Sequence, residues 1–145
     1  MQIIETNSPE ETKDLARSLA PMLKEAGVIA LAGELGAGKT CFVSGLVQAL
    51  GSEAVVSSPT FSLVNCYPAE SLVIYHFDMY RIDNYSDLES TGFFDHLSEE
   101  ALLIIEWSEK IELFLPAERT QITFVNQGEG RRKITVQELA TEGGA

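Results

Sequence analysis

The stretch Gly33–Thr40, with the sequence GELGAGKT, has the residue types and spacing that point most directly to a chemical task. It matches the P-loop pattern, in which a glycine is followed by four residues and then by Gly-Lys-Thr. Glycines in such a loop let the backbone turn tightly and point successive N–H groups toward phosphate oxygens. The stretch therefore predicts a binding site for a nucleoside triphosphate, and a glycine-rich turn with a coincidental lysine is the alternative.

The side chains in and just after this loop have separate predicted contacts. Lys39 can reach the β- and γ-phosphates, and Thr40 can offer its hydroxyl to Mg²⁺. Cys41 follows at a position where a hydroxyl would be the better phosphate donor, because a thiol donates weakly. The residues expected to contact the nucleotide are Gly33, Gly36, Ala37, Gly38, Lys39, Thr40 and Cys41.

Two carboxylates are candidates for the acidic partner that a P-loop needs for its metal ion. Asp78 follows the apolar run 72–77, and Glu106 follows the run 102–105. A carboxylate in that position points to the carboxyl end of the sheet, where open α/β sheets bind their ligands. Both residues are therefore predicted to be catalytic, and a strand-end carboxylate bonded to a turn is the alternative for each.

The segment 58–61, Ser-Pro-Thr-Phe, follows the loop at the distance of a switch segment. Pro59 restricts the residue before it to extended backbone geometry. The hydroxyl of Thr60 can then sense the γ-phosphate and the ligands of the metal. Thr60 therefore joins the predicted catalytic residues, and a surface turn is the alternative.

His76 stands two residues before Asp78, so the two side chains share one face of a strand. A lone histidine in this position is more often structural than catalytic. We therefore predict a structural role for His76, with a catalytic role as the alternative.

These residues need a strand and a helix to position them, and the flanking sequence predicts both. The apolar run 28–32 is typical of a buried strand, and 39–50 predicts a helix that Gly51 closes. This strand–loop–helix context is the one that the motif requires. Further strands are predicted at 2–6, 61–67, 72–77, 101–105, 120–125 and 133–137, and further helices at 9–26, 84–92 and 108–114.

The first helix carries its own start and stop signals. Ser8 is predicted to cap it, with Pro9 in the first helical position and Glu11 completing a capping box. Pro21 should kink this helix or end it before Gly27, because proline lacks the N–H of a helical hydrogen bond.

The order of the elements predicts the fold class. The strands 61–67 and 72–77, and likewise 120–125 and 133–137, are joined by short connections typical of antiparallel hairpins. Parallel strands around the loop then imply a mixed sheet. We predict one α/β domain over residues 1–145, with a three-layer P-loop NTPase-like fold, a parallel core and antiparallel edge hairpins.

Charge and composition narrow the classes of function. Ten Lys and Arg residues stand against 22 Asp and Glu residues, for a net charge of −12. Such a chain repels a nucleic acid backbone, so direct binding to DNA or RNA is not expected.

No apolar run approaches the ~20 residues that span a membrane. With no secretory signal pattern and two cysteines, Cys41 and Cys66, we expect a cytoplasmic protein with reduced thiols.

Four motifs, in this order, resemble one family, the small bacterial P-loop ATPase TsaE. They are 33–40, 58–61, the His-x-Asp-x-Tyr-Arg motif at 76–81, and the pair Glu106-Trp107. The resemblance covers nearly the full chain. The last two motifs at these separations are far more specific than the P-loop, which very many proteins share.

The resemblance implies a cytoplasmic, Mg²⁺-dependent ATPase of the pathway that makes threonylcarbamoyladenosine in tRNA. Its activity would be weak alone and would depend on the partner proteins TsaD and TsaB, whose transferase complex it would drive or reset. It would reach tRNA only indirectly, through that complex. By position, the implied roles are Mg²⁺ ligation by Thr40 and Glu106, phosphate binding by Lys39, support of the metal or attacking water by Asp78, and contact with the switch region by Trp107.

The resemblance also implies where the adenine lies, between the start of the first helix and the C-terminal hairpin. In this chain that points to Pro9–Thr12 and Arg131, which belongs to the basic cluster 131–133. A solvated hairpin end is the alternative for this cluster.

The chain departs from the family pattern at three positions. The family usually has Thr or Ser in place of Cys41, commonly Asp in place of Glu34, and frequently Pro in place of Ser108.

Two other classes of protein stay open at this point. A small-molecule kinase of the P-loop class shares the loop, but it usually adds a mobile lid with arginines, and this chain has few arginines and no evident lid. A regulatory GTPase or a non-hydrolysing nucleotide-binding scaffold is the third class. The Asn-Lys-x-Asp motif that reads guanine is absent from the sequence.

Overall fold

The apolar runs of this sequence form strands, and its amphipathic stretches form helices. Together they make one mixed sheet with helices on both of its faces. The structure is a computed structural model that describes residues 1–33, 38–57, 59, 63–97 and 99–140. The strands are β1 (Gln2–Thr6), β2 (Val28–Gly33), β3 (Val64–Pro68), β4 (Val73–Asp78), β5 (Leu102–Glu106), β6 (Arg119–Gly128) and β7 (Arg131–Leu139). The helices are α1 (Pro9–Leu23), α2 (Lys39–Ala49), α3 (Tyr85–Ser90), α4 (Phe93–Leu97) and the 3-10 helix η1 (Ser108–Phe114). Within these ranges, no helix is both long and apolar enough to cross a bilayer.

The strands form one sheet in the order β1-β7-β6-β2-β5-β4-β3. Its centre is parallel, because β2 pairs in parallel with both β5 and β6, and β5 pairs in parallel with β4. Strands β3 and β4 form one antiparallel hairpin, and β6 and β7 form the other. The predicted mixed sheet and both predicted hairpins are therefore confirmed. Strand β1 extends the second hairpin by pairing antiparallel with β7.

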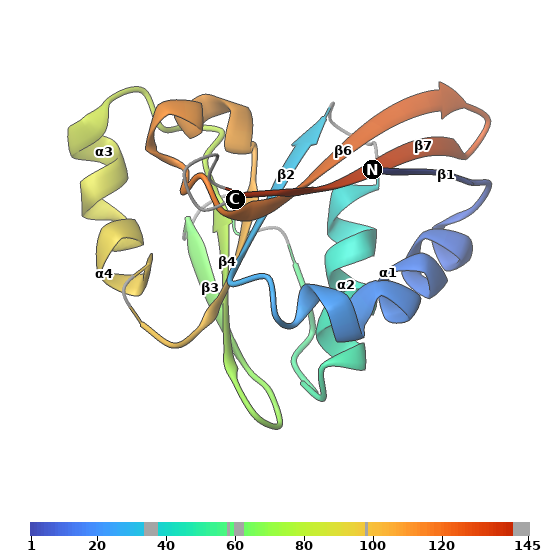
Figure 1. The fold of residues 1–145 in the computed structure, drawn as a ribbon, viewed down its shortest axis with the longest axis horizontal. Helices are drawn as coiled ribbons and strands as arrows, with labels where there is room; N and C mark the ends of the chain where they lie inside the picture. Colours follow the sequence, from blue (N-terminus) through green and yellow to red (C-terminus); the bar gives the residue numbers. More distant parts are fainter. Residues whose placement is uncertain (34–37, 58, 60–62, 98, 141–145) are drawn as a thin grey trace.

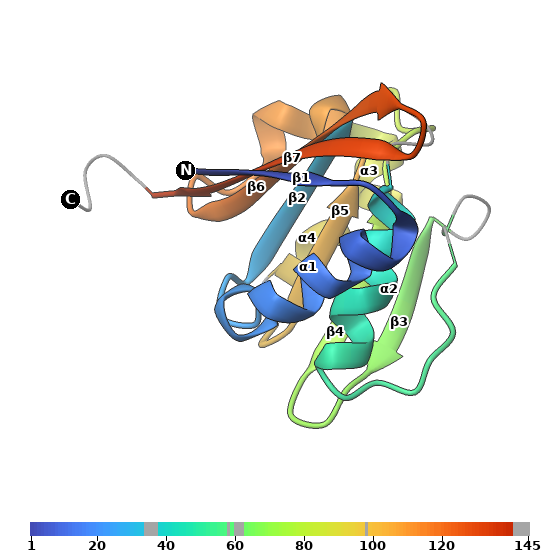
Figure 2. The ribbon, with the colours of Figure 1, turned by 90° about the vertical axis from the view of Figure 1, so that its right-hand side faces the viewer.

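Helices cover both faces of this sheet. Figures 1 and 2 show α1 and α2 together on one face, with α3, α4 and η1 on the other. In β5, Leu102 and Ile104 join the core beneath α1 and α2, whereas Leu103 and Ile105 join the core on the opposite face. Successive residues of a strand point to opposite faces, so a strand that is apolar throughout is buried on both sides. The three-layer prediction is confirmed.

Helix α1 begins as its cap residues predict. The Glu11 backbone N–H donates to Ser8 Oγ at 3.1 Å, and the Glu11 carboxylate accepts from the backbone N–H of Asn7 at 3.0 Å, one residue earlier than a standard capping box would have it. Pro21 lies inside the helix, which ends two residues later at Leu23. Gly27 then turns the chain with a φ of 74°, a left-handed conformation that favours glycine.

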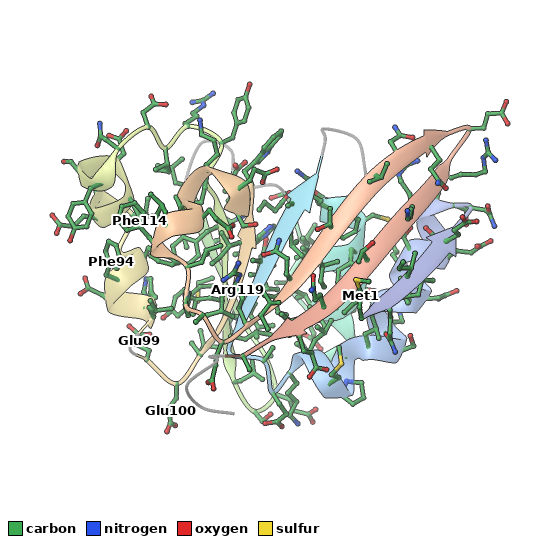
Figure 3. The ribbon with its side chains drawn as sticks, turned by 45° about the horizontal axis from the view of Figure 1, so that its top comes forward. Met1, Phe94, Glu99, Glu100, Phe114 and Arg119 are labelled. Atoms are coloured by element: carbon green, nitrogen blue, oxygen red, sulfur yellow. The ribbon has the colours of Figure 1, made fainter. Side chains whose placement is uncertain are left out.

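The α3–α4–η1 layer contains elements that the sequence pattern predicted incompletely. Helix α4 was not predicted, and the predicted 108–114 helix is a 3-10 helix. Aromatic rings join these pieces: Phe94 of α4 and Phe114 of η1 lie side by side (Figure 3), with centroids 6.3 Å apart, and Tyr85 of α3 lies within 5.7 Å of both. Contacts between aromatic rings hold the short helices together, which their own backbone hydrogen bonds would not do.

Candidate functional site

A cavity of about 500 Å³ lies at the carboxyl ends of β4 and β5, beside the start of α2. In the parallel sheet, Glu106 lies opposite Asp78 of β4 on one side and opposite Leu31 of β2 on the other. The three strands therefore bring their carboxyl ends to one edge, as open α/β sheets do at ligand sites. The cavity is lined by Ser8, Pro9, Thr12, Gly38, Lys39, Thr40, Cys41, Asp78, Tyr80, Glu106, Trp107, Gly130 and Arg132.

Most of the site residues predicted from sequence that the structure describes meet at this cavity. The residues on its wall are Gly38, Lys39, Thr40, Cys41, Asp78 and Glu106. Gly33 ends β2, where its backbone N–H and carbonyl bond to Glu109 and Lys39. The predicted site residues Gly36, Ala37 and Thr60 lie outside the described residues.

Arg131 is not among the residues that line the cavity, whereas its neighbour Arg132 is. Neighbouring residues of a strand point to opposite faces of the sheet. In β7, Ile134 and Val136 belong to the core under α1 and α2, and Arg132 shares their face. The alternation of β7 was visible in the sequence and could have identified Arg132 as the arginine on the α1 side. Ser8, Tyr80 and Gly130 were also not predicted as lining residues.

Lys39 is held in the site by two contacts. Its ammonium group donates a hydrogen bond of 2.7 Å to the carbonyl of Gly33 and lies 4.0 Å from the centre of the Trp107 ring. Burial lowers the pKa of Lys39, while the nearby Glu106, Glu109 and Asp78 carboxylates act in the opposite direction. The residue is only 5% exposed, so the site holds its cation largely out of water. A cation over an aromatic face is attracted by the electrons of the ring.

Trp107 takes an unusual backbone conformation to reach this position. Its φ of 57° lies in the left-handed region, which bulky residues rarely adopt. The ring contacts Tyr80, with centroids 4.9 Å apart, in addition to Lys39. Since Trp107 directly follows Glu106 and precedes η1, the turn joins the end of β5 to that helix. Glu109 of that helix accepts a hydrogen bond from the Gly33 backbone N–H at 3.3 Å.

The two carboxylates at the strand ends are buried and hydrogen-bonded. Asp78 and Glu106 are 5% and 4% exposed. Asp78 Oδ1 accepts from the backbone N–H of Tyr80 at 2.9 Å, and Glu106 Oε2 lies 2.5 Å from Nε2 of the fully buried His76. Buried carboxylates need such partners, because removing a charge from water without compensation is costly. His76 therefore bonds to a residue of the cavity wall, which its place in the sequence did not predict.

The donor set at the cavity fits a magnesium ion that is bound together with phosphate. No group of three or more His, Cys, Asp or Glu side chains able to hold a metal by itself is found in the described part of the chain. P-loop sites do not need such a group, because a hydroxyl, one or two carboxylates and nucleotide phosphates share the ligation. Thr40, Asp78 and Glu106 supply a hydroxyl and carboxylates on the wall of one cavity.

The far end of the cavity lies between α1 and the β6–β7 turn. Pro9 and Thr12 of α1 line it on one side, and Gly130 and Arg132 line it on the other. The Cys41 thiol donates to the carbonyl of Pro9 at 3.3 Å, and burial raises the pKa of this thiol. Cys41 therefore bonds to α1 in this structure.

Ser108 offers a test of packing beside the site. It is fully buried, and among the described residues its hydroxyl has no hydrogen-bond partner. An unsatisfied buried hydroxyl costs about 1–3 kcal/mol. We expect Ser108→Ala to raise the free energy of unfolding by about 1 kcal/mol, as measured by urea denaturation. Thr91→Ala serves as a comparison, because the Thr91 hydroxyl is bonded to the Leu88 carbonyl. A loss of stability in the Ser108 variant would show that its hydroxyl is satisfied.

The fold and the position of the motif define the class of protein. A mixed sheet with a parallel core carries the P-loop sequence between β2 and α2, and helices cover both of its faces. This is an α/β protein of the P-loop class.

Comparisons with known proteins identify the family within that class. The family model described as threonylcarbamoyl adenosine biosynthesis protein TsaE matches residues 6–134. The tRNA threonylcarbamoyladenosine biosynthesis protein TsaE of Bacillus subtilis (strain 168) is 39% identical over 130 residues, 90% of this chain and 81% of that protein. Its namesake in Treponema pallidum (strain Nichols) is 34% identical over 131 residues, 90% of this chain and 96% of that protein. The crystal structure of Bacillus subtilis YdiB matches with a TM-score of 0.80 at 33% identity, covering 96% of this chain and 86% of that one. The chain belongs to the TsaE family.

Proposed function

We propose that this protein is a Mg²⁺-dependent ATPase that serves the formation of threonylcarbamoyladenosine in tRNA. The observation that carries the proposal is that Lys39 of the P-loop sequence meets Asp78 and Glu106 at one cavity. A cation and two carboxylates are the side chains that phosphoryl transfer from a nucleotide requires. The pathway is taken from the names of the family model and the relatives.

In the proposed reaction, a water molecule attacks the γ-phosphorus of ATP, the bond to the β–γ bridging oxygen breaks, and ADP, phosphate and a proton are released. Lys39 leaves the Gly33 carbonyl and the Trp107 ring to pair with the β- and γ-phosphates. Asp78 orients the attacking water. Thr40 and Glu106 would hold a magnesium ion, which would supply positive charge to the phosphate oxygens. The buried setting strengthens each of these interactions, because little water competes.

The partners proposed for this activity are the proteins TsaD and TsaB. A net charge of −12 disfavours direct contact with tRNA, so tRNA is reached through the partners. ATP hydrolysis would then drive or reset their transferase. The two free cysteines, Cys41 and Cys66, fit a cytoplasmic setting.

The experiment that tests this function measures phosphate release from ATP by the purified chain, with and without TsaD and TsaB. We expect slow release alone, faster release with both partners, and ATP-dependent capture of the chain in a pull-down. A rate that the partners leave unchanged would contradict the proposed role. Phosphate transfer to a metabolite would favour a kinase, and tighter binding of GTP than of ATP would overturn the assignment of the base.

The two cysteines provide a separate prediction about where ATP binds. Cys41 lines the cavity and has a raised pKa because it is partly buried, whereas Cys66 is exposed. The thiolate is the reactive form, so iodoacetamide should modify Cys41 several-fold more slowly than Cys66 at pH 7.5. Adding Mg-ATP should slow Cys41 further and leave Cys66 unchanged, as measured by mass spectrometry of the peptides. Equal protection of both thiols would argue against ATP in this cavity.

A further inference from the structure

Glu106 is the first member of a hydrogen-bonded chain that runs across one face of the sheet, from β5 over β4 to β3. His76 is fully buried, with Nε2 at 2.5 Å from Glu106 Oε2 and Nδ1 at 3.1 Å from the hydroxyl of Tyr67. Tyr67 lies in β3, next to β4, and is itself 4% exposed. The Tyr67 hydroxyl also lies 3.2 Å from the backbone carbonyl of Ser57.

The hydrogen-bonded chain ends at Ser57, directly before the segment 58–61 in which the sequence predicts a switch. Ser57 is the last described residue before position 58, and it stands three residues before Thr60. Asn65 of β3 donates to the Ser57 carbonyl and to the Tyr67 hydroxyl, each at 3.3 Å. The chain therefore joins the carboxylate at the cavity to the main chain at the entrance of that segment.

Counting the available hydrogens shows which group donates in each bond of this hydrogen-bonded chain. An ionised Glu106 only accepts, so His76 donates from Nε2, and in the neutral ring Nδ1 must accept. Nδ1 then accepts the single hydrogen of the Tyr67 hydroxyl. The Ser57 carbonyl is a second acceptor within reach of that same hydrogen. Because Tyr67 has one hydrogen and two acceptors, the position of Ser57 decides how firmly Tyr67 holds the His76 ring.

We propose that His76 is a positioning residue for Glu106, and that Tyr67 ties this position to the main chain at Ser57. The inference rests on the proposed function, in which Glu106 helps to hold magnesium. A buried carboxylate without a partner has several rotamers, whereas a bond from a histidine ring that is fixed at its other nitrogen selects one. A change in the position of the Ser57 carbonyl would in this way change how firmly Glu106 is held for the metal.

The first experiment compares two tyrosine variants of neighbouring strands. Tyr67→Phe removes the hydroxyl that holds His76, whereas Tyr75→Phe removes a hydroxyl that bonds to Glu99 at the surface, away from the cavity. Fluorescence of Trp107, the one tryptophan of the sequence, reports binding of a non-hydrolysable ATP analogue as magnesium is titrated. Changing a residue that orients a metal ligand typically costs about 10–100-fold in metal affinity. We expect Tyr67→Phe to raise the half-saturating magnesium concentration about 10-fold and Tyr75→Phe to leave it unchanged.

Two variants of His76 separate positioning from packing. His76→Gln can keep a donor near the place of Nε2, whereas His76→Asn keeps only a group near the place of Nδ1. We expect the glutamine variant to bind magnesium closer to wild type than the asparagine variant does. Equal loss in both, or an unchanged magnesium dependence in Tyr67→Phe, would overturn the proposal. Analogue binding without magnesium serves as the control for damage to the fold, and a loss of the same size there would also overturn it.

A second measurement does not require nucleotide. Long-range ¹H–¹⁵N spectra of the free protein show which imidazole nitrogen carries the hydrogen. We expect Nε2–H in the wild-type protein and a changed Nδ1 shift in Tyr67→Phe but not in Tyr75→Phe. A hydrogen on Nδ1 in place of Nε2 would overturn the proposed direction of the chain. If the wild-type protein bound no Mg-ATP, the proposed function would fail, and this spectrum would still decide whether Tyr67 orients His76.

Discussion

Replacing Glu106 by glutamine is expected to slow ATP hydrolysis by at least about 100-fold, while the affinity for ATP falls by less than about 10-fold. Glu106 is buried at the cavity, and its carboxylate is proposed to hold magnesium. Glutamine keeps the volume and one oxygen that can accept from His76 Nε2, so the fold and this hydrogen bond are retained. The negative charge and one carboxylate oxygen are lost, because the amide NH2 group cannot ligate a metal, and both would help to hold magnesium at the phosphate oxygens.

The measurement is single-turnover phosphate release at saturating Mg-ATP, paired with a fluorescence titration of ATP binding. Glu112→Gln is the matched control, because Glu112 pairs with Arg119 at the surface and does not line the cavity. It should hydrolyse ATP at the wild-type rate. A Glu106 variant within a few-fold of wild type would remove Glu106 from the catalytic residues and would leave Asp78 as the acidic candidate.

Local sequence patterns predicted the part of the fold that carries the motif. The apolar run 28–32 and the helical stretch 39–50 became β2 and α2, because each is long enough for its periodicity to show. The same argument placed Asp78 and Glu106 at strand ends, and parallel pairing then brought both to one edge. A carboxylate that ends a predicted parallel strand can therefore be assigned to the ligand side of the sheet before the strand order is known.

What the sequence did not predict depends on contacts between distant segments. The pairing of β1 with β7 joins residues as far apart as Gln2 and Val136, and α4 is only five residues long, too short for a helical period. The bond between His76 and Glu106 exists because β4 and β5 are neighbours in the sheet. Strand order decides that neighbourhood, and a single sequence does not reveal it.

Close contact between α1 and α2 leads to the prediction with the largest effect on stability. A Cβ atom on Gly45 of α2 would come within 2.6 Å of the backbone oxygen of Lys13 and 2.8 Å of its Cα. These are main-chain atoms of α1, so no change of rotamer relieves the overlap. Gly45→Val should therefore force the helices apart and lower the free energy of unfolding by about 3 kcal/mol or more, because strain in a packed interior outweighs the small gain in helix propensity of valine over glycine.

The matched control for this change is Ser44→Val, which introduces the same side chain at a half-buried position one residue earlier in α2. Serine and valine have similar helix propensities, so this variant should lose less than about 1 kcal/mol in urea denaturation. Since α1 also carries Pro9 and Thr12 on the cavity wall, a displaced α1 should weaken ATP binding in the Gly45 variant under conditions where it stays folded. A Gly45 variant no less stable than the Ser44 variant would show that α1 yields at little cost. In that case the close approach of the two helices would not be what fixes the α1 side of the cavity.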